Sequence, residues 1–367
     1  MKKVVIGMSG GVDSSVAAIL LKQQGYEVIG LFMRNWDSTI NNDILGNPTL
    51  NENICPQEQD YNDALAVCQK LNIPLHRIDF VKEYWDYVFT YFLEELKKGR
   101  TPNPDIMCNK YIKFDYFVKE AKRLGADYIA TGHYARIKDG LLLRGIDANK
   151  DQTYFLSQLS KQQLENVLFP VGDLEKSEVR RIAKEYDLNT ATKKDSTGIC
   201  FIGERNFTNF LKNYLPNQPG KIKNIETGEI IGEHIGLMYY TIGQRKGLDL
   251  GGNQERLFVV GKDLKENILY VAFGEDNPYL ISDEAVIDTI NWIYPEKVKK
   301  CTVKFRYRQK DVPVCLEFKD DEIIVQYPQG SKAVTPGQAC VFYLEDICLG
   351  GGIIKEVRKN NQKLWYL

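Results

Sequence analysis

The first third of the chain alternates two patterns of hydrophobic and polar residues. Four short apolar runs are typical of strands buried in a sheet: 2–7, 27–33, 74–80 and 127–133. Segments between and after them space their apolar residues as amphipathic helices do: 14–24, 60–71, 83–98, 110–124 and 175–192. Strands separated by helices predict an α/β domain built on a parallel sheet.

The pattern changes after Pro216. Short apolar stretches with turn signals, such as ETGE at 226–229 and FKDDEIIVQYPQG at 318–330, continue to the end of the chain. They predict a β-rich half. Residues 36–58 are polar, rich in Asn and without periodicity, so we expect a long loop there, either an ordered lid or a disordered segment.

A chain of 367 residues is too long for one hydrophobic core. We expect three domains: an α/β catalytic domain over 1–205, a small central α/β linker domain over 206–275, and a barrel-like β domain over 276–367. Hydrophobic residues make up 43% and charged residues 26%, as in soluble globular proteins. No apolar run approaches the roughly 20 residues that span a bilayer. The apolar stretch near the N-terminus is broken by Gly7, so we expect a cytoplasmic protein without a membrane partner.

The net charge of −1 gives no global attraction to a polyanion, so any nucleic-acid surface must be a local patch. The segment from Lys297 to Lys310 is the candidate, because it holds seven basic residues and no acidic one. Lys300, Lys304 and Arg306 alternate with Cys301, Val303 and Phe305. This alternation predicts a strand with one basic and one apolar face. The alternative is an ordinary solvated strand face.

Eight cysteines and three histidines show no C-x-x-C pair, so we predict no structural metal site and no zinc. We also expect no structural disulfides in a cytoplasmic protein. Five cysteines lie in apolar helix-like or strand-like contexts and are interpreted as packing residues: 68, 301, 315, 340 and 348.

Two cysteines have different surroundings. Cys108 follows the turn-forming segment TPNPDIM, where a helix with Lys110 near its start is expected. Cys200 lies in a polar segment with Lys193, Lys194, Ser196 and Gly198. Nearby positive charge and a helix N-terminus lower the pKa of a thiol. Two such thiols without metal-ligand spacing indicate a redox or sulfur-relay pair rather than packing.

The string GMSGGVDSS, residues 7–15, follows the first predicted strand and opens a helix. Glycines let the backbone close around phosphate oxygens, while serine hydroxyls and the helix N–H groups donate to them. Asp13 could help to hold the Mg²⁺ that accompanies a pyrophosphate. Neither G-x-x-x-x-G-K-[ST] nor G-x-G-x-x-G is present, and a generic Gly-rich turn is the alternative.

Two further strand ends are expected near this loop. Ligands of open α/β sheets bind beyond the carboxyl ends of the strands. Gly132 and His133 end the fourth predicted strand, so Gly132 would let the backbone approach an adenosine and His133 would face the substrate. Met33 ends the second strand and is either an adenine contact or a core residue.

Six motifs occur in order along nearly the whole chain: GMSGGVDSS, NPDIMCNKYIKF, ATGHYAR, KDQTYFLSQL, STGICFIGERNF and YTIGQRKGL. Together they resemble the bacterial tRNA-specific 2-thiouridylases of the ATP pyrophosphatase, or PP-loop, superfamily. The resemblance implies an adenine-nucleotide-hydrolase-like fold for the N-terminal domain. It also implies a sulfurtransferase that acts on the wobble uridine of tRNA.

The resemblance further implies the chemistry. ATP, with Mg²⁺, would adenylylate the 2-oxo group of the uridine. Cys200 would carry a persulfide loaded by a cysteine desulfurase or a sulfur-relay protein, and Cys108 would be the nucleophile that attacks it and closes a transient disulfide. Alternatively the terminal sulfur attacks the base directly and Cys108 then resolves the bond. Asp105 would be the general acid/base.

Binding residues also follow from the resemblance. ATP would bind Gly7, Met8, Ser9, Gly10, Gly11, Val12, Asp13, Ser14, Met33 and Gly132. The tRNA and its target base would contact Asn103, Pro104, Asp105, His133, Lys150, Asp151, Gln152, Tyr307, Arg308 and Gln338.

Two other functions compete with this interpretation. An amide-forming ATP pyrophosphatase would need neither paired thiols nor a basic strand. An RNA-binding protein with a nucleotide sensor would bind without releasing pyrophosphate.

Overall fold

The computed structural model describes residues 1–50, 55–195, 198–248, 250 and 256–367, so Ser196 and residues 51–54 of the predicted loop lie outside the described residues. The chain forms two compact units. The first comprises Met1–Thr90, Pro104–Phe210 and Asp346–Leu349, and the second comprises Tyr91–Asn103, Leu211–Glu345 and Gly350–Leu367.

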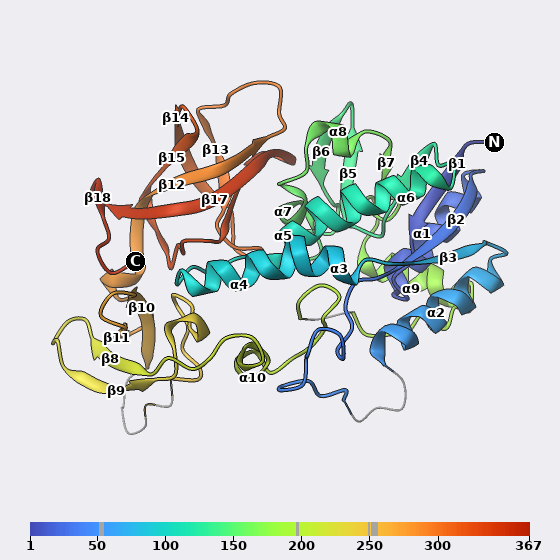
Figure 1. The fold of residues 1–367 in the computed structure, drawn as a ribbon. Helices are drawn as coiled ribbons and strands as arrows, with labels where there is room; N and C mark the ends of the chain where they lie inside the picture. Colours follow the sequence, from blue (N-terminus) through green and yellow to red (C-terminus); the bar gives the residue numbers. More distant parts are fainter. Residues whose placement is uncertain (51–54, 196–197, 249, 251–255) are drawn as a thin grey trace. The chain divides into compact units, whose positions relative to one another are not determined.

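A parallel sheet lies at the centre of the first unit (Figure 1). Its order is β3 (Leu75–Asp79), β2 (Glu27–Arg34), β1 (Lys3–Gly7), β4 (Tyr128–Ala130) and β7 (Val167–Leu168). All four predicted strands are confirmed. From β1 the chain moves to β2 and β3 on one side and returns to β4 on the other, so the strand order reverses between β1 and β4. In sheets of this kind, ligands bind at that switch point.

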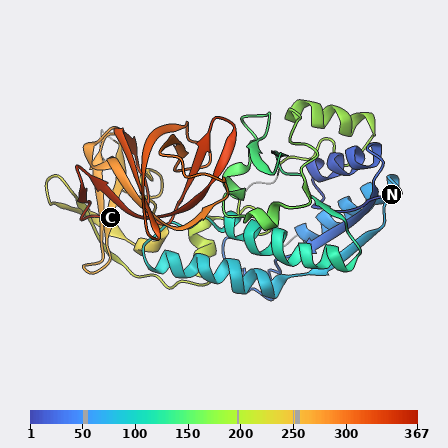
Figure 2. The same cartoon turned by 90° about the horizontal axis from the view of Figure 1, so that it is seen from above.

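Helices cover both faces of this sheet. Apolar residues of α1 (Val12–Gln23), α2 (Pro56–Lys70) and α9 (Lys176–Glu185) form one core with β1 and β2. Figure 2 shows α1 and α9 on one side of the sheet and α6 (Phe117–Arg123) on the other. The fold class predicted from the alternating pattern is therefore confirmed, although α9 ends seven residues before the predicted 192 because Asp187 takes a positive φ of 46°.

The helical segments after β3 differ from the prediction in one respect that affects the site. The first is α3 (Val81–Tyr84), η1 (Trp85–Phe89) and α4 (Thr90–Lys97). The second begins at Pro104 with α5 (Pro104–Met107) and continues through a π-helix, η2 (Cys108–Tyr116), into α6. The expectation that this helix starts near Lys110 was wrong, because proline is well suited to the first turn of a helix. Cys108 therefore lies inside the helical segment.

Smaller elements complete the first unit. They are β5 (Ala135–Lys138), β6 (Leu141–Arg144), α7 (Thr153–Leu156) and α8 (Lys161–Leu164), and α10 (Phe207–Lys212) follows at its end. The described part of the predicted loop, residues 36–50, is ordered by packing. Trp36 is 2% exposed and Asp43 is fully buried.

The second unit is rich in β-strands, as the turn-rich pattern predicted. One sheet has the order β10 (Leu257–Asp263), β11 (Ile268–Phe273), β8 (Gly220–Asn224) and β9 (Ile230–His234). The 3₁₀ turns are η3 (Leu237–Tyr239) and η4 (Pro278–Leu280).

The remaining strands follow one another as β12 (Ile281–Trp292), β15 (Glu322–Lys332), β14 (Val312–Lys319), β13 (Lys300–Lys304), β16 (Ala339–Leu344) and β17 (Ile347–Lys359). β17 pairs with β12 as well as with the short β18 (Gln362–Lys363), so the sheet closes on itself. The predicted barrel-like character of the C-terminal part is confirmed. No helix among the described residues is long and apolar enough to cross a membrane.

Candidate active site

The loop between β1 and α1 presents hydrogen-bond donors that no capping side chain covers. Gly11 is the N-cap of α1 and brings no side chain to cover the N–H groups of the first turn, which have no intrahelical acceptor. The Ser9 and Ser14 hydroxyls lie 3.1 Å apart, and Ser14 also accepts from the Ser9 N–H at 3.2 Å. Gly10 has a φ of +71°, and a Cβ there would lie 2.2 Å from the Asp60 carbonyl oxygen. Only glycine fits this turn, and the turn presents N–H and hydroxyl donors suited to phosphate.

Charged side chains surround the start of α1. Asp13 accepts a 2.7 Å hydrogen bond from the Tyr134 hydroxyl and two hydrogen bonds from Lys176, at 2.6 and 2.8 Å. The Lys176 ammonium also lies 2.9 Å from Asp195. Asp195 in turn pairs with Lys150 at 2.6 Å and Arg180 at 2.9 Å. These paired cations hold the pKa of the Asp195 carboxyl at about 2.

On the other side of the loop, Lys193 donates to the Gly10 carbonyl at 3.0 Å and to Asp60 at 2.7 Å, and it also pairs with Asp63. The sequence interpretation had assigned Lys193 to the surroundings of Cys200. In the structure, Lys193 instead holds the loop between β1 and α1 (residues 8–11, called the phosphate loop below) against α2. Lys176, Arg180 and Asp195 were missed because they carry no motif and reach the loop only through the tertiary fold.

The ends of the neighbouring strands lie where the prediction put them. Residue Ile6 of β1 pairs with Ala130 of β4, so Gly132 follows the edge that carries the phosphate loop. A Cβ on Gly132 would lie 2.8 Å from the Ser14 nitrogen, which gives this glycine a packing reason as well. Met33 is buried, with its methyl carbon 3.7 Å from where a Gly7 Cβ would stand.

His133 is buried at the end of this edge. Its Nδ1 lies 2.8 Å from the Thr131 hydroxyl, and its ring lies among Phe114 and Phe169. Burial lowers the pKa of His133 well below its ordinary value, so the imidazole is neutral at physiological pH.

The two singled-out thiols face each other. The Cys108 and Cys200 sulfur atoms are 3.8 Å apart, and both cysteines are free. Cys108 is completely buried, whereas Cys200 is partly exposed. A disulfide needs a sulfur–sulfur distance of about 2.05 Å, so a shift of less than about 2 Å would close the bond. The pairing of these two cysteines, separated by 92 positions, matches the sequence interpretation.

Asp105 holds the Cys200 segment in place. Its Oδ1 accepts a 2.9 Å hydrogen bond from the Cys200 N–H, and the Tyr84 hydroxyl donates to the Cys200 carbonyl at 2.8 Å. Asp105 and Cys108 are three residues apart on one helical segment, so their side chains lie on the same face. Burial raises the pKa of the Asp105 carboxyl, opposed by the hydrogen bond from Cys200 and the charge of Lys113.

The two thiols are not equivalent. Burial raises the pKa of Cys108 well above the ordinary thiol value, and its bond to Cys200 adds to that effect. The hydrogen bond from Cys108 lowers the pKa of Cys200, and the Lys113 ammonium lowers it further, against the effect of burial. Cys200 is therefore the thiol that ionises first and Cys108 the one that keeps its proton.

A buried ion pair fixes the segment after Cys200. Asp43, fully buried, accepts from Arg205 at 2.8 and 2.9 Å and from the Trp36 indole at 3.0 Å. The Asn206 N–H also bonds the Gly46 carbonyl at 3.0 Å. Residues 36–50 thus clamp the chain that carries Cys200. Sequence reasoning missed this clamp, since its partners are 162 positions apart.

Three residues expected to contact tRNA shape the loop before α7. Lys150 pairs with Asp195, as described above. Asp151 is buried and accepts from the Gly145 N–H and the Thr153 hydroxyl. The Gln152 side chain accepts from the Tyr134 N–H at 3.0 Å.

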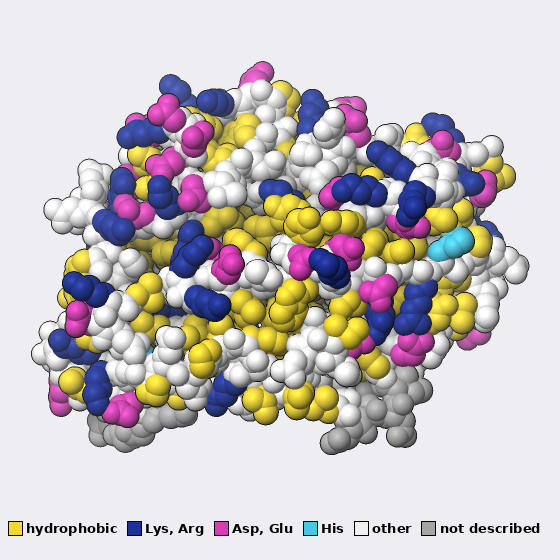
Figure 3. Space-filling model, in the orientation of Figure 1, with side chains coloured by type: hydrophobic (Ala, Val, Ile, Leu, Met, Phe, Trp, Pro, Cys, Tyr) yellow, Lys and Arg dark blue, Asp and Glu magenta, His cyan; other side chains and the backbone are white. Residues whose placement is uncertain are grey.

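Three further expected tRNA contacts, Tyr307, Arg308 and Gln338, lie in the second unit. Arg308 is exposed, with its guanidinium 5.9 Å from the centre of the Tyr307 ring. Gln338 donates to the Thr101 carbonyl at 2.7 Å. Over the face seen in Figure 3, basic and acidic side chains are interspersed rather than segregated.

The predicted basic strand over 297–310 was partly wrong. Only Lys300–Lys304 is a strand, and the chain turns at 305–308. Arg306 is exposed, but its guanidinium is not free, because it donates to the Ile242 and Ala333 carbonyls at 3.1 and 2.6 Å. The interpretation of Cys315 as a packing residue was also wrong, because it lies on the outward face of β14 and is exposed. Cys68, Cys340 and Cys348 are buried as predicted, and Cys301 is partly buried.

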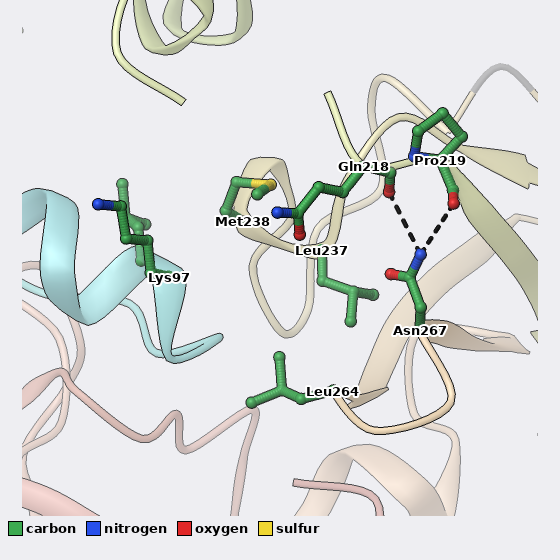
Figure 4. A pocket seen from close by; sticks show the side chains of 8 residues that line it. Lys97, Gln218, Pro219, Leu237, Met238, Leu264 and Asn267 are labelled. Atoms are coloured by element: carbon green, nitrogen blue, oxygen red, sulfur yellow. Dashed lines mark hydrogen bonds between the residues drawn. The ribbon is translucent and has the colours of Figure 1, made fainter. Parts of the chain in front are cut away.

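A cavity of about 410 Å³ lies within the second unit (Figure 4). It is lined by Leu237, Met238 and Leu264, and Asn267 at its edge donates to the Gln218 and Pro219 carbonyls. Lys97 is the ionisable residue among those that line it. It offers no pair of groups for acid–base or thiol chemistry.

A glycine- and serine-rich phosphate loop at the switch point of a parallel sheet defines the first unit as a PP-loop nucleotide-binding fold, here carrying a facing thiol pair. Comparisons with known proteins specify the class. Three family models match the chain: the tRNA methyl transferase HUP domain at 2–204, the tRNA methyl transferase PRC-barrel domain at 208–273 and the aminomethyltransferase beta-barrel domain at 282–354.

Curated relatives are similar along the full length. The protein named tRNA-specific 2-thiouridylase MnmA from Mesoplasma florum is 61% identical over 368 residues, covering 96% of this chain and 98% of the relative. Its namesake from Mycoplasma capricolum subsp. capricolum is 59% identical over 373 residues, covering 98% and 100%. The chain therefore belongs to the tRNA-specific 2-thiouridylase family of enzymes. The solved NMN synthetase of Francisella tularensis is more distant, at 20% identity with a TM-score of 0.32 over 53% of this chain and 66% of that one.

Proposed function

We propose that this enzyme is a tRNA sulfurtransferase that replaces the 2-oxygen of the wobble uridine with sulfur. The single observation that carries the proposal is the pair of free thiols 3.8 Å apart, with the Asp105 carboxylate accepting a hydrogen bond from the backbone N–H of Cys200. Family membership supports tRNA as the substrate, since its curated members are named for it.

The first step would activate the base with ATP. A uridine 2-oxygen is a poor leaving group, and adenylylation turns it into AMP. The donors from Gly7 to Ser14 would bind the phosphates, and Lys176 would neutralise charge on the leaving pyrophosphate. Asp13 lies at the start of α1 and is the carboxylate that would help to hold a Mg²⁺ carried by the nucleotide. The ion would neutralise phosphate charge.

The second step would deliver sulfur. The Cys200 thiolate attacks the outer sulfur of a donor persulfide, supplied by a cysteine desulfurase or a relay protein, and the donor leaves as a thiolate. Cys108 then attacks the Cys200 sulfur, which forms the Cys108–Cys200 disulfide and releases the outer sulfur as sulfide. The persulfide sulfur gains two electrons and the two cysteines lose them. Sulfide adds to the activated carbon and AMP leaves.

The remaining groups fit these steps. Asp105, whose pKa is raised by burial, can exchange a proton at the base or at the thiols. His133, neutral and buried, would line the pocket of a flipped-out base. A thiol reductant must reopen the disulfide before the next cycle. Direct attack by the persulfide on the base would leave the same disulfide, with Cys108 acting afterwards.

The test is a reconstituted reaction with tRNA, ATP and a persulfide donor. We expect tRNA-dependent exchange of pyrophosphate into ATP, and a nucleoside product in which one sulfur replaces one oxygen by mass. An amide-forming ligase would exchange pyrophosphate without thiolating tRNA. A nucleotide-sensing RNA-binding protein would bind both ligands without exchange. Either result would contradict the proposal.

A further inference from the structure

The π-helix η2 gives Lys113 an unusual position. In an α-helix, residues five apart point about 140° away from each other. In a π-helix, each N–H bonds the carbonyl five residues earlier, so residue i+5 lies about one turn after residue i. Such bonding is seen at the end of η2, where the Phe117 N–H bonds the Ile112 carbonyl, and the helical path breaks at Phe114. Lys113 follows Cys108 by five positions, so π winding brings it to the thiol-bearing face.

The surroundings of Lys113 agree with this geometry. Its Nζ lies 5.5 Å from the centre of the ring of Phe201, the residue next to Cys200, and within electrostatic range of the Cys200 sulfur. It also lies within electrostatic range of Asp105 and Cys108.

Other nearby lysines have other partners. Lys110 Nζ lies 3.5 Å from the Gln158 side chain, and Lys193 holds the phosphate loop. Among the described residues around the thiol pair, Lys113 is the cation whose charge acts on the Cys200 thiol.

We propose that Lys113 is a catalytic residue whose ammonium holds the sulfur anion on Cys200. It would stabilise first the thiolate that accepts sulfur and then the outer sulfur of the persulfide. The second role rests on the proposed sulfur transfer, whereas the first is a property of the thiol pair alone.

The electrostatics around the thiols favour this role. The charged or titratable groups that act on them are Asp105 from α5, Tyr84 from α3 and Lys113 from η2, and His133 after β4 lies within range of Lys113. His133 is neutral, and Asp105 opposes formation of a sulfur anion. Lys113 therefore supplies the positive charge, and its own pKa is raised by the two thiols and Asp105 against the effect of burial.

The experiment measures the rate at which iodoacetamide alkylates Cys200 as a function of pH, without ATP or tRNA, by peptide mass analysis. We expect Lys113→Met to raise the midpoint of the pH profile by about one unit, which slows alkylation about tenfold below the midpoint. Lys113→Arg should keep the midpoint near that of the wild type. Lys119→Met, exposed on α6, is the matched control and should change nothing.

Folding is read in the same spectra, because Cys68 and Cys340 are buried and react only in an unfolded chain. If Cys68 or Cys340 reacts in Lys113→Met, that variant is unfolded, and Lys113→Gln is compared with Lys113→Arg instead. An unchanged midpoint in a folded Met or Gln variant would overturn the inference. A raised midpoint in Lys113→Met, together with a wild-type enzyme that does not thiolate tRNA, would support the role of Lys113 and contradict the proposed function instead.

Discussion

Lys176, the first residue of α9, donates to both carboxylate oxygens of Asp13, in the first turn of α1, at 2.6 and 2.8 Å. Its side chain is 12% exposed and also contacts Asp195. Two helices far apart in sequence thus place an ammonium group beside the donors of the phosphate loop. In the proposed reaction, a cation held there would be preorganised for the charge that develops on pyrophosphate.

We therefore expect Lys176→Met to reduce tRNA-dependent pyrophosphate release by about 100-fold or more. The Kd for tRNA should be unchanged, because the loss is confined to the phosphate site. Lys184→Met, exposed on the same helix, is the control. Asp13→Ala should also abolish adenylylation. Undiminished release in either site variant would exclude these residues from the ATP site.

The clamp between Asp43 and Arg205 predicts an effect on both stability and sulfur transfer. Arg205→Met leaves a buried carboxylate without its cation, which costs about 3–5 kcal/mol of unfolding free energy. Urea unfolding measures this loss. Lys221→Met removes an exposed ion pair with Glu233 and should change the unfolding free energy little.

Where the Arg205→Met variant stays folded, sulfur transfer should fall more than pyrophosphate exchange, because the clamp holds the Cys200 segment and not the phosphate loop. Equal losses in the two activities would show that the clamp supports the whole unit rather than Cys200.

The pattern of the chain was sufficient for the parallel sheet and the β-rich half, since both depend on local periodicity. The sequence was also sufficient to single out Cys108 and Cys200 as a pair, because each lies in a distinctive motif. It could not place Lys113, because the α-helical spacing that sequence reasoning assumes turns that residue away from the thiols. Nor could it show that Arg306 binds two backbone carbonyls, since those partners meet it only in the folded barrel.

Arg306 and Arg308 should consequently behave differently. Arg308→Ala removes an exposed cation and should weaken tRNA binding while lowering the slope of log K against log salt by about one unit. Arg306→Ala should mainly destabilise the fold, because it removes the guanidinium donor of the Ile242 carbonyl and one of two donors to the Ala333 carbonyl. Titrations at several salt concentrations measure the first effect and urea unfolding the second. If Arg308→Ala left the slope of log K against log salt unchanged, this surface would be an ordinary solvated face and not a tRNA contact.

The buried His133 predicts a pH dependence of stability. Its pKa in the folded state lies well below the ordinary value, so below about pH 6.5 the unfolded chain binds a proton that the folded chain does not. Stability should therefore fall as the pH drops from 7.5 to 5.5, by up to about 1.4 kcal/mol per unit from this residue. His133→Asn should show a shallower decline in urea unfolding. The pH slope of His133→Asn is compared with that of His234→Asn, because burial also lowers the pKa of His234. An identical pH slope in wild type and His133→Asn would contradict a buried neutral imidazole.

The central claim is that Cys108 and Cys200 act as one sulfur-transferring pair. Its most direct test is non-reducing mass analysis after a single turnover with tRNA, ATP and a persulfide donor. We predict a Cys108–Cys200 linkage in the wild type. Cys200→Ser should adenylylate tRNA without accepting sulfur, and Cys108→Ser should hold a persulfide on Cys200 without turning over. Cys315→Ser, which removes an exposed thiol elsewhere, should match the wild type. The account is wrong if the wild type shows no such linkage and Cys108→Ser thiolates tRNA at the normal rate.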